Sequence, residues 1–191
     1  MRLQTNYGKP WLGVSVGYGL LKSDDFYGLS SVMLSYEGFS YHKIRFDLHL
    51  GLESSPIQEA SLLNKSLDGG ILMLQLGVDV NFFTTPPHTF MGQYFMIGTD
   101  IVFMSWSYRN PLIVLDEYGD EVKIESDGLS GLDLNLGLGW HLAQTKYFIL
   151  GGEVQPGVIF WGPYTTEDFE NDVFPTFWYL RLTVTMKLRL W

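Results

Sequence analysis

The chain has 191 residues, a formal net charge of −9, 16% aromatic residues and no cysteine. This length suits one domain with its own core, and we treat residues 1–191 as a single domain in which residues 1–10 are a lead-in. The lack of cysteine excludes a disulfide scaffold and a thiolate zinc site, and the acidic charge argues against binding to nucleic acid.

Apolar and polar residues alternate with a period of two along most of the chain, as they do in strands with one apolar face. In residues 71–82, for example, Leu74 and Leu76 fall on one face, and Gln75 and Asp79 fall on the other. In chain order the same alternation predicts eight strands over residues 12–20, 31–37, 44–53, 71–82, 95–103, 132–142, 148–160 and 180–190.

The connections between these strands differ in length. The predicted loops at one end are residues 22–26, 54–70, 109–128 and 162–176, and the predicted turns at the other end are residues 38–40, 83–93 and 143–146. The first loop is short and the middle turn is long for this scheme. Strands of about ten residues with longer loops at one end are nevertheless typical of membrane barrels. We therefore predict an all-β fold, an eight-stranded antiparallel up-and-down transmembrane β-barrel.

The polar faces of the strands carry charges of both signs, which fits the narrow interior of such a barrel. The residues expected to form this lumen network are Arg45, Asp47, His49, Asp79, Asp100, Asp133, Glu153, Arg181, Lys187 and Arg189. Most of the acidic surplus lies in the loops: residues 109–128 hold six acidic and two basic residues. The strands and turns are almost neutral, which predicts that the lumen charges pair with one another.

Aromatic residues near the strand ends favour a membrane location for the apolar face. One expected belt holds Tyr36, Phe82, Trp140 and Trp191, and the other holds Trp106, Phe160 and Trp178. Such belts mark the two membrane–water interfaces. A soluble ligand-binding β-barrel, whose apolar face points inward, is the alternative.

Two further expectations concern the interior of the barrel. If the third and fourth strands meet with Leu52 near Leu72, Arg45 lies opposite Asp79 and forms an ion pair with it. The first strand offers only glycine and serine to the interior, so the long side chains of the last strand are expected to fill the bore. A filled bore predicts no porin-like conductance.

Neither a signal peptide nor a spanning helix is visible in the sequence. Residues 1–10 lack the apolar stretch of a signal peptide, so we expect an exported protein to be represented here in its mature form. The longest uncharged stretch, residues 80–99, contains two consecutive prolines and many polar groups, which argues against a membrane-spanning helix.

Strand number, alternation, loop asymmetry and the C-terminal segment TVTMKLRLW resemble the small eight-stranded bacterial outer-membrane β-barrel proteins, the OmpA/OmpX-like architecture. In that family a terminal aromatic residue is part of the signal read by the barrel-assembly machinery. Here it is Trp191, which departs from the family in falling on the polar parity. The resemblance implies an integral outer-membrane protein in contact with lipid and lipopolysaccharide, with periplasmic termini and extracellular acidic loops. It leaves the activity open, because the fold hosts unrelated functions.

No catalytic constellation is visible in the sequence. His49 and Asp47 share the polar face, which favours a hydrogen-bonded lumen pair over a catalytic dyad. Ser105 and Ser107 lie near the predicted outer ends without a histidine at a fitting spacing, so a lipid A-modifying enzyme is only an alternative. The main prediction is a non-enzymatic barrel without cofactor or metal, with a structural or adhesive role or a place in a larger envelope complex. The acidic loops are expected to be a solvated surface, with divalent-cation binding as the alternative.

Overall fold

The structure of the chain is a computed structural model that describes residues 10–22, 28–41, 43–56, 61–62, 65–84, 92–115, 118–162 and 176–190. Within these ranges no helix is long and apolar enough to span a membrane. The strands are β1 (Trp11–Lys22), β2 (Leu29–Tyr41), β3 (Ile44–Pro56), β4 (Ser61–Leu62), β5 (Lys65–Phe83), β6 (Gln93–Leu115), β7 (Glu121–Gln144), β8 (Phe148–Trp161) and β9 (Phe177–Arg189).

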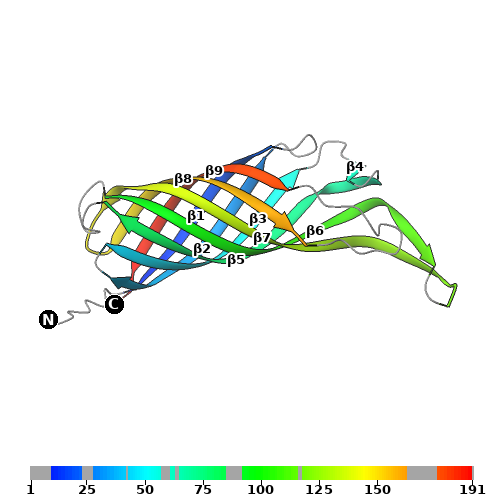
Figure 1. Ribbon diagram of the computed structural model, residues 1–191, viewed down its shortest axis with the longest axis horizontal. Helices are drawn as coiled ribbons and strands as arrows, with labels where there is room; N and C mark the ends of the chain where they lie inside the picture. Colours follow the sequence, from blue (N-terminus) through cyan, green and yellow to red (C-terminus); the bar gives the residue numbers. More distant parts are fainter. Residues whose placement is uncertain are drawn as a thin grey trace.

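Eight of these strands close into a ring in which each strand pairs antiparallel with its neighbours along the chain. The two-residue β4 stands outside the ring and pairs with β5, while β3 pairs directly with β5. The ring closes between the first and last strands, whose register runs from Trp11 opposite Arg189 to Lys22 opposite Trp178. Figure 1 shows the tilted strands wrapped around one axis. The predicted all-β fold with eight antiparallel strands in a ring is confirmed.

The two faces of the strands differ sharply in exposure. On β5, Leu76 is 57% exposed and the adjacent Gln75 is fully buried, and the same alternation runs along β9. The period of two places successive side chains on opposite faces of a strand. The outer surface of the ring therefore consists of the apolar side chains, and the charged side chains point into the barrel.

The register between β3 and β5 differs from the predicted one by two residues. Leu52 lies opposite Leu74, which places Arg45 opposite Asn81 and Asp47 opposite Asp79. The predicted Arg45–Asp79 ion pair is therefore wrong. The reason is that both strands continue beyond the expected loop boundary, as far as the pairing of residue 56 with residue 70. A shift of two residues keeps every side chain on its face, so the assignment of inner and outer residues is unaffected.

The prediction that residues 109–128 form a loop is wrong, because most of this segment is strand. β6 continues to Leu115 and β7 starts at Glu121, and the turn between them contains Gly119 at a φ of 83°. The pairing of β6 with β5 ends at Tyr108, so residues 109–115 and 118–126 form a two-stranded ribbon that we call the arm. Figure 1 shows the β6–β7 hairpin reaching well past the ring. The aliphatic, partly β-branched residues on both sides of the turn favour strand over loop.

Candidate functional site

Nine of the ten residues predicted for the lumen network lie on the inner face of the barrel. They are Arg45, Asp47, His49, Asp79, Asp100, Asp133, Glu153, Arg181 and Lys187. Together with Glu37, Glu53, Gln75, Tyr94, Asn135 and Gln155 they form what we call the polar layer. The tenth, Arg189, lies at the rim, where its Nη1 donates to the Lys146 carbonyl at 3.5 Å and its guanidinium lies 5.8 Å from the centre of the Trp11 ring.

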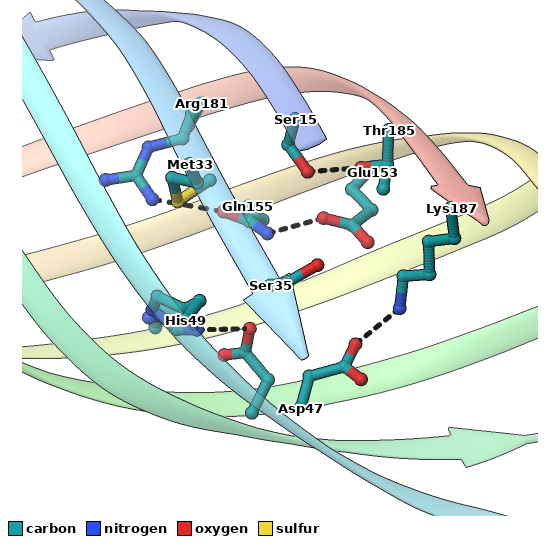
Figure 2. Close-up of a pocket in the computed structure, with 12 residues that line it drawn as sticks. Ser15, Met33, Ser35, Asp47, His49, Glu153, Gln155, Arg181, Thr185 and Lys187 are labelled. Atoms are coloured by element: carbon teal, nitrogen blue, oxygen red, sulfur yellow. Dashed lines mark hydrogen bonds and ion pairs between the residues drawn. The ribbon is translucent and has the colours of Figure 1, made fainter. Parts of the chain in front are cut away.

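Three cations of the polar layer bind carboxylates directly. Arg45 Nη1 lies 2.6 Å from Glu37 Oε1, and Arg181 Nη2 lies 2.5 Å from Glu53 Oε1. Lys187 Nζ donates to Asp47 Oδ2 at 2.6 Å and to Glu37 Oε2 at 3.2 Å. Figure 2 shows the Lys187–Asp47 pair reaching across the interior. Such pairs are needed where charges are buried, because an unpaired charge in a dry interior is costly.

His49 is held between two carboxylates. Its Nδ1 lies 3.1 Å from Asp79 Oδ2 and its Nε2 lies 2.5 Å from Asp100 Oδ1, so both ring nitrogens are engaged. The expected pairing of His49 with Asp47 is wrong, because Asp47 binds Lys187 and Asn81 instead. A histidine flanked by carboxylates on both sides has no ring nitrogen left to activate a nucleophile.

Neutral groups also donate hydrogen bonds to carboxylates of the polar layer. Tyr179 donates its hydroxyl proton to Asp133 Oδ2 at 2.6 Å, and Tyr94 donates to Glu153. Gln75 donates to Glu53 Oε2 at 3.0 Å. Sequence reasoning did not select Glu37 or Glu53, although both lie on the inward parity of their strands. The alternation of inward and outward residues along their strands would have been enough to identify both as lumen residues.

The other half of the interior is apolar. Ten buried residues, which we call the apolar layer, pack together there: Leu29, Ile71, Met73, Val102, Met104, Trp106, Tyr108, Ile159, Phe177 and Tyr179. Trp161 packs against this layer with its ring edge-on to Phe177, at a centroid distance of 5.5 Å. Trp106 is only 2% exposed, so its prediction as a member of an outward aromatic belt is wrong. It follows the inward parity of β6, as Met104 does.

The remaining belt residues lie where the outward parity places them. Tyr36, Phe82, Phe160 and Trp178 are exposed on the outer surface at 42%, 38%, 46% and 59%, respectively. Trp140 is half-buried. Trp191 lies outside the described residues. The described aromatic residues thus lie near both ends of the aliphatic band.

The free space inside the polar layer is small. One cavity of about 20 Å³ is lined by residues that include Ser15, Ser35, Asp47, Glu153 and Thr185. Figure 2 shows these side chains converging from several strands. This volume holds one water-sized particle and leaves no room for a substrate. Among the described residues, no group of three or more histidine or acidic side chains is arranged to hold a metal ion.

Comparison with solved structures places this fold among known barrels. Neisserial surface protein A has a TM-score of 0.59 and 11% sequence identity, with 95% of this chain and 97% of that chain covered. Ail, the attachment invasion locus protein of Yersinia pestis, has a TM-score of 0.53 and 12% identity, with 96% and 99% covered. No protein-family model and no curated protein matches the sequence. The predicted resemblance is confirmed at the level of the fold: the chain has the fold of the small eight-stranded outer-membrane β-barrels.

Proposed function

We propose that this protein is an integral, non-enzymatic barrel of the bacterial outer membrane, with a lumen closed by its own side chains. The observation that carries the proposal is the inversion of the two faces. Outward leucines such as Leu76, Leu136 and Leu182 are 50–57% exposed, whereas the ion-paired Arg181 is 1% exposed. In water this arrangement would expose a continuous apolar surface, and in a bilayer the same surface contacts hydrocarbon.

The way the interior is filled supports the proposed closed lumen. The small cavity of about 20 Å³ in the polar layer and the packing of the apolar layer support a bore without a continuous water-filled path. The small residues of β1 support this arrangement, since Gly13 lies opposite Lys187 and Gly19 opposite Arg181. The long inward side chains of β9 therefore extend over the inner face of β1, which carries mostly glycine and serine. A filled bore favours a structural or adhesive role over transport.

The distribution of charge supports periplasmic turns and an extracellular arm. The described residues at the turn end include Lys43, Lys146 and Arg189, and the described part of the arm carries Asp120, Glu121 and Glu125 against Arg109 and Lys123. In outer-membrane barrels the short turns are periplasmic and the longer connections are extracellular. The arm would then meet lipopolysaccharide, other envelope proteins or foreign surfaces, and the barrel-assembly machinery would insert the chain. The arm is the element we propose for adhesion or assembly, because it projects beyond the ring.

Cysteine labelling on whole cells tests the orientation, and the chain has no native cysteine to interfere. Tyr118 at the tip of the arm is 82% exposed, so Tyr118→Cys should react with an impermeant maleimide on intact cells. The matched control is Thr145→Cys in the exposed turn between β7 and β8, which should react only after the outer membrane is ruptured. The reverse pattern would overturn the proposed orientation.

Conductance measurements test the closed lumen. Monomeric protein in planar bilayers should give no stable, porin-like current steps, because side chains of the polar layer fill the proposed closed lumen. Large steps from protein shown to be monomeric would contradict the closed lumen and leave the membrane location standing.

A further inference from the structure

A pocket separate from the cavity of the polar layer lies at the turn end of the barrel. It has a volume of about 260 Å³ and is lined by Trp11, Gln144, Thr145, Lys146 and Arg189. The start of β1, the end of β9 and the turn between β7 and β8 meet there, at the end opposite the arm (Figure 1). The lining contains two basic residues and no acidic residue. The pocket is therefore positively charged, and it has room for a polar group of several atoms.

The two cations of this pocket form no ion pair with a carboxylate among the described residues. Glu37 lies opposite Trp11 on the neighbouring strand, but it is already bound by Arg45 and Lys187. Both cations of the pocket therefore remain available to an anionic ligand.

Arg189 is fixed in place by the backbone of the adjacent turn and by an aromatic ring. Its backbone N–H donates to the Tyr147 carbonyl at 2.9 Å, and its Nη1 donates to the Lys146 carbonyl at 3.5 Å. Its guanidinium lies 5.8 Å from the centre of the Trp11 ring. Its Nε is buried and has no hydrogen-bond partner within the described structure, which is rare for a buried donor. The guanidinium fork matches the paired oxygens of a phosphate or carboxylate group.

Lys146 places a second positive charge beside a ring that suits the membrane–water interface. Its Nζ lies 5.2 Å from the centre of the Tyr147 ring, and Tyr147 is 63% exposed. In the proposed membrane location, this end of the barrel lies at the level of the lipid headgroups, where tyrosine and tryptophan are enriched. Basic pockets at this level bind anionic lipid headgroups.

From this geometry we propose that the pocket binds the phosphate of an anionic phospholipid headgroup, with Arg189 and Lys146 as donors to the phosphate oxygens. The inference rests on the proposed membrane location, and in the proposed orientation the lipid comes from the periplasmic leaflet. A zwitterionic headgroup carries an ammonium group of its own, which the two cations of the pocket repel. The pocket therefore selects a lipid with a net negative charge, such as phosphatidylglycerol, over phosphatidylcholine.

The test measures the urea unfolding midpoint of the protein in phosphatidylcholine vesicles in which an increasing share of the lipid is replaced by phosphatidylglycerol. A ligand that binds only the folded state stabilises it by mass action. We expect the midpoint to rise with phosphatidylglycerol and then to level off. A midpoint that does not respond to phosphatidylglycerol would overturn the proposal.

Variants separate the pocket from general attraction between a basic rim and an anionic membrane. Lys146→Gln should reduce the rise, and Lys146→Gln combined with Arg189→Gln should abolish it, each compared with the midpoint of the same variant in pure phosphatidylcholine. The matched control is Lys43→Gln, which removes an exposed turn lysine at the same end of the barrel but outside the pocket lining. Lys43 donates to the Thr84 carbonyl at 2.9 Å, and its variant should keep the full rise. An equal reduction in Lys43→Gln and Lys146→Gln, or a full rise in the double variant, would overturn the site.

Inorganic phosphate distinguishes a lipid headgroup from a free anion. Added to the protein in pure phosphatidylcholine vesicles, it should change the midpoint no more than NaCl of equal ionic strength does. A saturating rise with inorganic phosphate that the double variant lacks would overturn the lipid as the ligand. Protein that fails to insert into vesicles would contradict the proposed membrane location, whereas inserted protein without a response to phosphatidylglycerol would contradict only this pocket.

Discussion

The two halves of the barrel interior are stabilised in different ways. In the polar layer, buried charges are compensated by partners on other strands, as in the Arg181–Glu53 ion pair. Removing one partner of such a pair leaves the other charge buried and unpaired. In the apolar layer, Met73, Trp106 and Phe177 pack together as they would in the core of a soluble domain. The comparison shows that the interior of this barrel is not uniformly polar, and that a hydrophobic core can lie inside an apolar outer face.

The largest expected effect comes from removing one partner of an isolated ion pair in the polar layer. Arg181→Leu leaves Glu53, which is fully buried, without its cation, and should lower the free energy of unfolding by about 3–5 kcal/mol. Urea unfolding of the protein in vesicles measures this loss. The matched variant Arg45→Leu should lose less, because Glu37 keeps Lys187 at 3.2 Å. Equal losses in the two variants would show that the polar layer does not depend on individual pairs.

A cavity mutation tests whether the apolar layer behaves as a core. Met73 is fully buried, and Met73→Ala should lower the free energy of unfolding by about 2–5 kcal/mol, because the rigid surroundings cannot close the cavity. Its neighbour Leu74 is 43% exposed on the outer face, where lipid chains would fill the space in the proposed membrane location. Leu74→Ala should therefore cost less in the same urea titration. A larger loss at Leu74 would reverse the assignment of the two faces.

A charge on the outer face tests the membrane contact itself. Leu136 lies on the outer face of β7 and is 50% exposed, and Leu136→Arg should cost roughly 2–4 kcal/mol if it meets the bilayer midplane. Tyr118→Arg on the arm, which is in water in the proposed orientation, should be nearly neutral. Unfolding midpoints in vesicles measure both variants.

A spin label attached to Leu136→Cys gives an independent measure of the same contact. We expect its electron-spin relaxation to respond to oxygen, which dissolves in lipid, more strongly than to a water-soluble nickel complex. A dominant nickel response would place this surface in water and contradict the proposed location.

The same comparison explains what the sequence could predict. In the polar layer, alternation is visible because charged residues such as Asp47 and Asp133 lie between apolar ones, so the inner face could be assigned residue by residue. In the apolar layer, stretches such as residues 71–74 and 101–104 are apolar on both faces. The parity of Asp100, continued along β6, does place Trp106 inward, but the predicted strand ended at residue 103 and an aromatic residue beyond it was assigned to a belt.

The register between paired strands is harder to predict from sequence than the face on which each side chain lies. Every register that differs by two residues places the same side chains inward, so alternation cannot choose between Asp79 and Asn81 as the neighbour of Arg45. The choice depends on where β3 and β5 stop pairing, and those positions lie in a segment without alternation. The strands of the arm were not predicted for a related reason. Charged and apolar residues follow one another there without a fixed period, so the segment resembles a loop.

The smallest expected effect concerns the arm, where neither kind of interior stabilisation is present. Val122 is 44% exposed on β7, beyond the residues of this strand that pair with β8, and it is not part of the apolar layer. Val122→Ser should therefore change the free energy of unfolding by no more than about 0.5 kcal/mol, as substitutions on an exposed surface usually do. The urea midpoint of the vesicle-embedded variant measures this change, with Met73→Ala in the apolar layer as the reference for a buried site. A loss at Val122 comparable to that at Met73 would mean that the arm folds back onto the barrel as part of its core, and it would then be unavailable for the adhesive or assembly role we propose.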